Sequence, residues 1–370
     1  MNYKGNPEYR HDSPSCTGIL ITNLGTPDEP TASSVRKYLA EFLSDPRVIE
    51  LPRYLWWLIL HGVILRVRPS RSAKAYKKIW TENGSPLLSI SKKQVSGLEK
   101  ILTKKIRGPI KIKLSMRYGN PSIKSGLKKL QESNANRILV LPLYPQYSAA
   151  TTGSTFDAVT NELKKWRWLP EIRMINHYHD DPSYIDALAN SIQNYWQDNL
   201  RPQKLIFSFH GLPKHYFLAG DPYHCECHKT ARLVAEKLKL NQEEWLVTFQ
   251  SRFGPKEWLK PYTDKTLISL AENGIKSINV ICPGFSADCL ETLEEINIQN
   301  REFFTKAGGE TFAYIPALND SFGHLELLSN IILKHAKGWP EFSINWDQEK
   351  INKDLSKSRE LAEKSTHNKD

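Results

Sequence analysis

Short apolar runs alternate along the chain with longer stretches in which apolar side chains recur every three or four residues. Leu98, Ile101 and Leu102 belong to one such stretch, and Ile185 and Leu188 to another. The short runs predict strands and the long stretches predict helices. Strands alternating with helices favour parallel α/β sheets covered on both faces. The predicted strands cover residues 18–23, 110–116, 137–143, 171–176, 205–209, 245–249, 278–282 and 311–315.

These strands divide into four plus four, with a crossing near residues 180–182, and the turns after 141 and 281 both contain proline. We therefore predict two Rossmann-like domains, each with a four-stranded parallel sheet flanked by helices, and an active-site cleft between them. The predicted division is a polar segment (1–15), an N-terminal domain (16–180), a C-terminal domain (181–340) and a polar tail (341–370). The last helix of the C-terminal domain is expected to pack back on the first domain. The tail is expected to be a frayed helix or a disordered segment.

In sheets of this kind, ligands bind beyond the carboxyl ends of the strands. Residues 23–27 after the first strand lack the phosphate-loop pattern, and no Gly-x-Gly-x-x-Gly follows any strand. Nucleotide binding therefore has no sequence support.

The third strand runs into residues 144–154, which are rich in hydroxyls and aromatic rings. Tyr144 offers a stacking face for a flat ligand, although a capped turn would need only one of these hydroxyls. Arg117, at the end of the second strand, either grips a ligand carboxylate or pairs with a neighbouring acid.

His210 ends the fifth strand, where the chain must turn at Gly211. A lone histidine is more often structural, but the end of a central strand is where ligands bind. After the seventh strand, Asp288, Glu291 and Glu295 fall on one face of a predicted helix. The helix dipole accounts for an acid at Asp288 but not for a stripe that continues to Glu295.

An imidazole facing carboxylates suits the handling of metal ions and protons. The sequence has no His-Glu-x-x-His motif and no paired-cysteine cage, so a tightly held zinc is not favoured. Oxygen and imidazole ligands suit a metal that passes through, and a base active near neutral pH removes protons from a weak acid. Metal insertion into a macrocycle needs both.

The formal net charge of +11 favours an anionic partner. Residues 51–81 contain seven Arg or Lys and no acid, and they open with the apolar run 54–60. An apolar lip at 51–76 with a basic collar predicts contact with a membrane surface rather than with nucleic acid. The alternative is a buried helix followed by a solvated basic one.

No stretch of about 20 apolar residues occurs, and residues 1–15 lack a signal-peptide core. We expect a cytoplasmic protein attached peripherally to a membrane. Five cysteines do not suit a disulfide framework. His224, Cys225, Cys227 and His228 could hold a metal, but neighbouring residues cannot readily surround one ion, and an exposed loop leading to a helix at 230–240 is the better interpretation.

The motifs at these strand ends resemble those of the ferrochelatase family, from about residue 18 to 329. The matching segments, in the family's order, are NLGTP (23–27), YPQYS (144–148), TTGS (151–154), SFHGLP (208–213), GDPY (220–223), FQSRFGP (249–255) with WL (258–259), and ETL (291–293). The resemblance implies a lyase that inserts ferrous iron into protoporphyrin IX, the terminal step of haem biosynthesis.

The resemblance also implies roles for individual residues. His210 and Glu291 would be the catalytic pair, with His210 either accepting pyrrole protons or ligating iron, and Glu291 also ligating it. Asp288 and Glu295 would extend a path for protons or iron. The remaining implied residues line the porphyrin site (Arg117, Tyr118, Tyr144, Ser148, Trp258) or form the membrane lip (Leu55, Trp56, Leu58, Ile59).

Two positions depart from relatives. Ala149 stands where animal members have a cluster cysteine, so we exclude the animal iron–sulfur cluster and expect no tightly bound cofactor. Cys289 stands where several relatives have histidine.

The alternatives to a protoporphyrin ferrochelatase are a coproporphyrin III ferrochelatase, a non-catalytic tetrapyrrole carrier on the same fold, and a nucleic-acid or membrane-surface binder with steep salt dependence.

Overall fold

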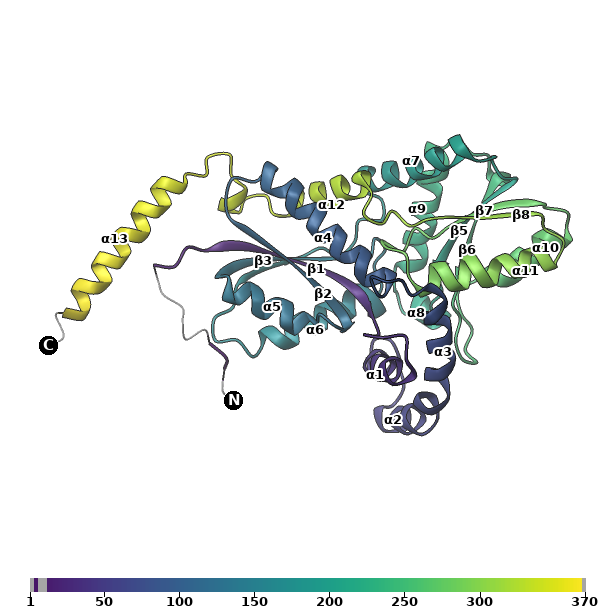
Figure 1. Cartoon of the computed structure of the whole chain (residues 1–370), viewed down its shortest axis with the longest axis horizontal. Helices are drawn as coiled ribbons and strands as arrows, with labels where there is room; N and C mark the ends of the chain where they lie inside the picture. The colour runs from purple at the N-terminus through teal and green to yellow at the C-terminus, as the bar shows by residue number, and fades with distance from the viewer. Residues whose placement is uncertain (1–2, 6–11, 368–370) are drawn as a thin grey trace.

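The chain forms two four-stranded parallel sheets lying side by side (Figure 1). The computed structural model describes residues 3–5 and 12–367. The first sheet has the order β2-β1-β3-β4 and the second the order β6-β5-β7-β8, so the two topologies are the same. This confirms the prediction of two helix-flanked parallel sheets. The strands are β1 (Cys16–Thr26), β2 (Ile110–Gly119), β3 (Ala135–Pro142), β4 (Glu171–Met174), β5 (Lys204–His210), β6 (Trp245–Gln250), β7 (Ser277–Ile281) and β8 (Thr311–Ile315).

Helices cover both faces of each sheet (Figure 1). The α-helices are α1 (Ala32–Leu43), α2 (Arg53–Ile59), α3 (Leu65–Ile79), α4 (Pro86–Lys105), α5 (Ile123–Glu132), α6 (Ser154–Leu163), α7 (Pro182–Asp198), α8 (Lys214–Leu218), α9 (Tyr223–Lys237), α10 (Thr263–Glu272), α11 (Arg301–Lys306), α12 (Phe322–His335) and α13 (Gln348–His367). Three segments are π-helical, namely η1 (Leu60–Ile64), η2 (Ala149–Gly153) and η4 (Glu291–Asn300), and two are 3-10 turns, η3 (Gln242–Glu244) and η5 (Pro340–Phe342).

Alternation along the central strands explains the layers. Ile19 and Ile21 of β1 point into a core cluster that includes residues of α4 and α12, while Leu20 points into a second cluster with α5. Side chains of successive strand residues face opposite sides of a sheet, so a strand buried on both faces must be apolar throughout. Burying each such side chain contributes roughly 1.5–3 kcal/mol.

One core cluster joins the two sheets. It contains β1 and β3 residues, β5 residues such as Phe207 and Phe209, and buried residues of α4, α7, α9 and α12. At Gly97 of α4 a Cβ atom would lie only 2.4 Å from Leu325 of α12, so these helices pack closely. The helix after the last strand thus packs against a helix of the first half.

The segment after α12 continues this packing before it leaves the body. The Glu341 carboxylate is buried and accepts hydrogen bonds from Thr17 Oγ1 (3.0 Å) and Arg137 Nη1 (2.9 Å). Helix α13 follows and extends away from the sheets (Figure 1).

Helices α1 to α3 form a separate projection beside the sheets (Figure 1). Its own core includes Val35, Leu39 and Leu60, and it packs against Tyr118 of β2 and Leu293 of η4. The projection therefore contacts elements of both halves of the chain.

Gly25 in β1 is required by close backbone packing. Its φ is +112°, and a Cβ atom there would lie 1.8 Å from the Tyr118 carbonyl oxygen of the paired strand β2. We expect Gly25→Ala to lower the free energy of unfolding by about 3 kcal/mol or more, because strain and a backbone clash combine. Urea unfolding measures this.

The matched control is Gly62→Ala in η1, where nothing lies within 4 Å of the added Cβ. That change removes backbone freedom from the unfolded chain and should leave stability unchanged or raise it by about 0.5–1 kcal/mol. Equal effects of the two substitutions would contradict the packing argument.

Candidate functional site

The carboxyl ends of the central strands bring the main candidate residues together. In each sheet the second strand lies on one side of the first strand and the third strand on its other side. The direction in which strands are added to the sheet therefore reverses at β1 and at β5. Such switch points are where ligands bind in doubly wound sheets. His210 is the last residue of β5, Tyr144 follows β3, and Glu291 follows β7.

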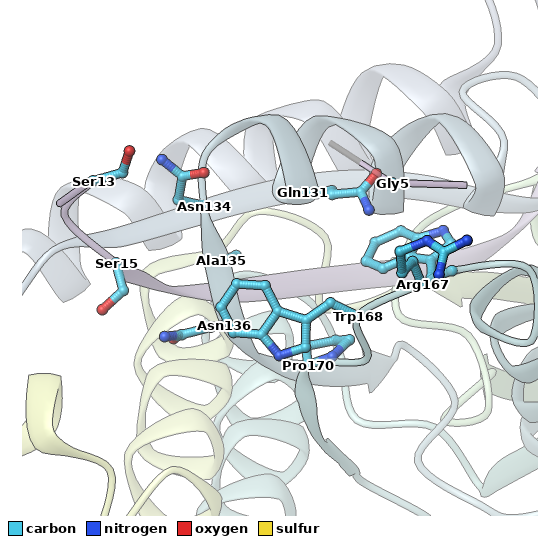
Figure 2. Close-up of a pocket in the computed structure, with 11 residues that line it drawn as sticks. Gly5, Ser13, Ser15, Gln131, Asn134, Ala135, Asn136, Arg167, Trp168 and Pro170 are labelled. Atoms are coloured by element: carbon cyan, nitrogen blue, oxygen red, sulfur yellow. The ribbon is translucent and has the colours of Figure 1, made fainter. Parts of the chain in front are cut away.

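A pocket lies at the other end of the first sheet, where its strands begin. Gln131, Ala135 and Trp168 are among its lining residues, close to where β1 and β3 begin (Figure 2). Its lining contains neither histidine nor acid. The chemistry expected of metal insertion therefore does not lie there.

The His210 ring is held in one tautomer. Its Nδ1 lies 2.7 Å from the Gly211 carbonyl oxygen, which can only accept, so Nδ1 carries the hydrogen and donates it. Nε2 of the neutral ring then keeps a lone pair for a proton or a metal ion. The His210 and Phe285 ring centroids are 6.5 Å apart, and a Cβ on Gly211 would lie 2.7 Å from the Gln250 carbonyl oxygen.

Gln250 connects His210 with the acidic segment. It is the strand partner of His210 in β6, and its Nε2 donates to the Glu291 carbonyl oxygen over 3.0 Å. Its Oε1 accepts a hydrogen bond from Ser208 Oγ at 2.7 Å, which orients the amide. The backbone of Glu291 is thus bonded to Gln250, the residue that lies opposite His210 in the neighbouring strand.

Two tyrosines of the α1–α3 projection lie near enough to Glu291 to be affected by its charge. Burial raises the pKa of Tyr38 and Tyr76 well above the usual value, and the Glu291 charge raises both further. Burial lowers the pKa of Arg68 in α3, and the same Glu291 charge opposes that effect. The electrostatic coupling shows that the projection and η4 meet at Glu291.

Glu295 is the second acid of this segment. Its carboxylate accepts hydrogen bonds from the backbone N–H of Ser251 (2.7 Å) and from the Ser251 hydroxyl. Burial raises the pKa of Glu295 to about 7, and the Glu291 charge contributes in the same direction while the Ser251 bonds oppose it. Glu295 can therefore take up and release a proton near neutral pH.

Asp288 does not belong to the helical stripe that the spacing predicted. It precedes η4 in an irregular segment, because residues 282–289 form a turn after β7. Its buried carboxylate accepts hydrogen bonds from Tyr314 (2.6 Å), Asn319 (2.7 Å) and Thr292 (3.0 Å). Asp288 anchors the turn, and the stripe begins at Glu291.

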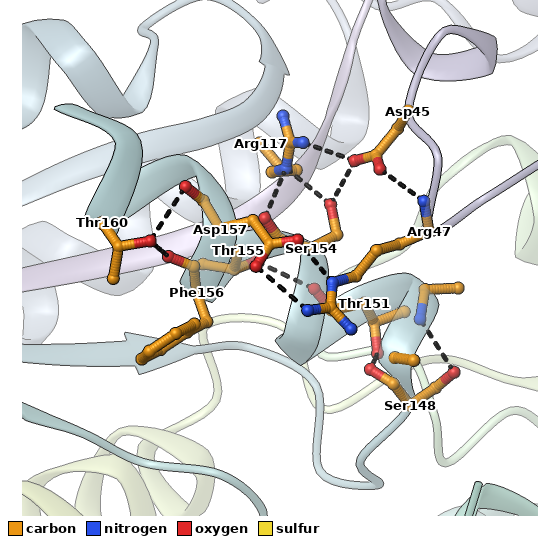
Figure 3. Close-up of polar contacts among 12 residues, drawn as sticks. Asp45, Arg47, Arg117, Ser148, Thr151, Ser154, Thr155, Phe156, Asp157 and Thr160 are labelled. Carbon is orange, nitrogen blue, oxygen red and sulfur yellow. Dashed lines mark hydrogen bonds and ion pairs between the residues drawn. The ribbon is translucent and has the colours of Figure 1, made fainter. Parts of the chain in front are cut away.

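Arg117 takes the second of its two expected roles, pairing with a neighbouring acid. It lies within β2 and pairs through Nη2 with the Asp45 carboxylate, while its Nε donates to Ser154 Oγ at 2.6 Å (Figure 3). Tyr118 is buried, and its hydroxyl also donates to Asp45, at 2.8 Å. Neither side chain is directed at a ligand in this arrangement.

Asp45 organises this network. Burial alone would raise the pKa of Asp45, but hydrogen bonds from Ser154 and the Arg47 amide, together with the Arg117 charge, lower it. Arg47 in turn donates through Nη2 to Asp157 at 3.0 Å (Figure 3). The contacts fasten the chain after α1 to β2 and α6.

The other three residues predicted to line the porphyrin site differ in whether they are available to a ligand. Ser148 is fully buried and donates to Asp221 at 3.0 Å, so it caps η2 and does not face a ligand. Trp258 would be 3.1 Å from a Cβ on Gly211, beside His210. The buried hydroxyl of Tyr144 has no hydrogen-bond partner among the described residues, which leaves it available to a ligand.

The apolar lip differs from expectation at one residue. Trp56 is only 5% exposed, and its Nε1 donates to the Leu43 carbonyl oxygen at 2.6 Å, so it anchors α2 to α1. Trp57 is 59% exposed instead. Helical periodicity turns every third or fourth side chain inward, and the sequence did not show which. The exposed apolar residues of α2 and η1 are Tyr54, Leu55, Trp57, Leu58, Ile59 and Val63.

The segment 224–228 was expected to be a loop, and this was wrong. Helix α9 begins at Tyr223, so the segment forms its first turns. Cys227 is buried inside the core, whereas Cys225 is exposed, so the two thiols point apart. The His224 and His228 rings lie next to each other, with their centroids 4.5 Å apart.

Several residues of the site had no distinguishing signal in the sequence. Tyr38 and Tyr76 occupy apolar positions of helices and read as core residues. Asp45 sits in a short link after α1, where an acid is common. Gln250, together with Ser154, Ser208 and Ser251, stood inside the family motifs.

Comparisons with known proteins agree with this arrangement. The structure of SirB from Bacillus subtilis with Fe3+ has a TM-score of 0.51 at 12% identity and covers 89% of this chain and 100% of that one. A sirohydrochlorin chelatase structure with cobalt matches equally well, with a TM-score of 0.51 at 12% identity over 90% of this chain and 100% of that one. The fold is therefore that of the chelatases.

The sequence comparisons are more specific. The profile of the ferrochelatase family matches residues 16–336. A ferrochelatase of Thioalkalivibrio sulfidiphilus is 57% identical over 94% of both chains, and one of Nitrosococcus oceani is 55% identical over 98% of both. The chain belongs to the ferrochelatase family, which confirms the family and the lyase function predicted from its motifs.

The raised pKa of Glu295 has a consequence for stability. The folded chain binds this proton more tightly than the unfolded chain does, so its stability falls as pH rises from about 4.5 through about 7. The fall amounts to roughly 3 kcal/mol at most. In Glu295→Gln the group cannot ionise, and we expect the variant to gain stability relative to wild type between pH 5 and 8.

Thermal unfolding of both proteins across this pH range measures the gain. The exposed Glu310→Gln should show no such change relative to wild type. A difference between Glu295→Gln and wild type that does not vary with pH would contradict the assigned pKa.

Proposed function

We propose that this chain inserts ferrous iron into protoporphyrin IX and that His210 and Glu291 act at the reacting centre. The observation that carries the proposal is the 2.7 Å contact of His210 Nδ1 with the Gly211 carbonyl oxygen, since donation from Nδ1 to this acceptor leaves the Nε2 lone pair free. Gln250 holds the Glu291 backbone beside it. A positioned base and a carboxylate are what insertion requires.

The reaction exchanges one Fe²⁺ ion for two pyrrole protons. His210 Nε2 has one lone pair, so it would accept the two protons one after the other, releasing the first before it takes the second, as the nitrogen lone pairs turn to iron. Glu291 would neutralise the incoming cation. Glu295, with its pKa of about 7, would pass protons onward from the centre. The alternative order, in which His210 first ligates iron, uses the same lone pair.

Aromatic groups would hold the macrocycle. Tyr144 presents an unpartnered hydroxyl, and Trp258 lies beside Gly211. Arg117, Tyr118 and Ser148 would act indirectly, because their polar groups are engaged by Asp45 and Asp221. These three are positioning residues in this proposal.

The activity would need no resident cofactor. The four buried cysteines, Cys16, Cys227, Cys282 and Cys289, belong to four different core clusters. A cluster or zinc cage needs thiolates that converge on one point.

The chain would collect its apolar substrate at a membrane surface in the cytoplasm. Exposed apolar side chains of α2 and η1 lie next to a helix, α3, that carries the exposed Arg66 and Arg71. Apolar contact with a basic collar favours anionic membranes. Among the described residues, no helix is both long enough and apolar enough to cross a bilayer.

His210→Ala tests the catalytic assignment. With ferrous iron and protoporphyrin under anaerobic conditions, we expect the rate of metalloporphyrin formation to fall at least about 100-fold, because the base is lost. Porphyrin binding, followed by tryptophan fluorescence quenching, should persist.

His215→Ala in α8 is the matched control and should keep full activity, since His215 faces Glu50 at 3.4 Å. Wild-type activity in His210→Ala would refute the role. Binding without turnover in wild type would indicate a carrier, and faster turnover of coproporphyrin III would indicate the other substrate.

The lip is tested by Leu58→Glu with Ile59→Glu. We expect sedimentation with anionic liposomes to drop at least about tenfold, since two apolar contacts are lost and two charges oppose the surface. The control pair, Leu200→Glu with Phe322→Glu, changes two apolar residues that are more exposed and lie outside the lip. Equal losses in both pairs would contradict a specific membrane face.

A further inference from the structure

Three potential metal ligands converge outside the candidate active site. His177 and His179 follow β4, and Glu226 lies in the first turn of α9. One ligand atom from each residue lies within 4.8 Å of the other two. The residues come from segments almost 50 positions apart, and the fold alone brings them together.

The distances suit a small cation. His177 Nδ1 lies 2.7 Å from Glu226 Oε1, and His179 Nδ1 lies 3.3 Å from Glu226 Oε2. Donors at about 2.0–2.2 Å from a tetrahedral zinc-type ion are about 3.4 Å from one another. Small side-chain rotations would place all three atoms around one ion.

One buried group in the cluster lacks a hydrogen-bond partner. Nδ1 of His179 lies 3.3 Å from Glu226 Oε2 but makes no hydrogen bond among the described residues. The buried Glu226 carboxylate accepts a hydrogen bond from the Tyr147 backbone N–H and contacts His177 Nδ1, but no Lys or Arg of the described residues pairs with it. Leaving the His179 nitrogen unsatisfied is costly, and a cation would use its lone pair and offset the Glu226 charge.

The surroundings hold the ligands in place. Thr230, one turn after Glu226 in α9, donates its hydroxyl to the His179 carbonyl oxygen at 2.7 Å. On the other side of the ring, His179 Nε2 is 3.8 Å from Asp180, too far for a hydrogen bond, and Asp180 pairs with Lys229 at 2.5 Å.

We propose that His177, His179 and Glu226 bind a divalent transition-metal ion of the zinc or ferrous class. The two-histidine, one-carboxylate set favours such ions over calcium or magnesium, which prefer oxygen ligands. The His177 side chain is 50% exposed, so the ion can enter from solvent and keep a water ligand.

The site borders the loop that carries Tyr144. Glu226 Oε2 accepts a hydrogen bond from the Tyr147 backbone N–H at 2.7 Å, and Tyr178 N–H donates to the Pro145 carbonyl oxygen at 2.9 Å. A bound ion would therefore stabilise the loop as well as the cluster.

Zn²⁺ titration of the porphyrin-free, chelator-treated full chain tests the site by calorimetry. We expect one equivalent whose affinity falls at least about tenfold in His177→Ala and in Glu226→Gln, but is retained in His210→Ala. Zn²⁺ should also raise the thermal unfolding midpoint of wild type more than that of His177→Ala. His215→Ala is the matched control and should bind as wild type does.

Unchanged affinity in both His177→Ala and Glu226→Gln would overturn the proposal, and so would a loss of binding in His224→Ala with His228→Ala instead. Circular dichroism establishes that each variant is folded. Iron insertion by His177→Ala should proceed at the wild-type rate in the same buffer. Loss of the zinc site and failure of the proposed activity are thus separate results.

Discussion

The apolar core shared by the two sheets is the constraint on which the rest of the structure depends. Helices α4, α7, α9 and α12 bury side chains in a single cluster with β1, β3 and β5. Because close-packed interiors resist shifts, this cluster sets the positions of the strand ends relative to one another. Groups from both halves can then meet without direct bonds between the sheets.

The polar site is built on that frame by a few buried hydrogen bonds. Gln250 and Ser208 orient the segment around Glu291, while Asp45 and Arg117 fasten the chain after α1 to β2 and α6. Buried polar groups that are fully bonded are rigid. Among the groups left without hydrogen bonds are the Tyr144 hydroxyl in the site and His179 Nδ1 outside it, and these two are available to ligands.

In the proposed function, the α1–α3 projection would couple substrate entry to chemistry. Its outer surface exposes Trp57 and Leu58, and its inner surface places Tyr38 and Tyr76 near Glu291. One small helical unit thus presents an apolar face to the surroundings and aromatic rings to the acid. An apolar, planar substrate would meet apolar side chains on the outer surface of the projection and aromatic rings on its inner surface.

The sequence alone determined the strands, their parallel pairing, the family and the positions of His210 and Glu291, because strand periodicity and motifs at strand ends are local signals. Tertiary structure decided which face each helix buries, so that Trp56 turned inward and Trp57 outward. It also decided the partners of Arg117 and Asp288, since their acceptors and donors lie far away in the chain. His177, His179 and Glu226 meet only because the segment after β4 packs against the start of α9, and sequence spacing carries no information about that contact.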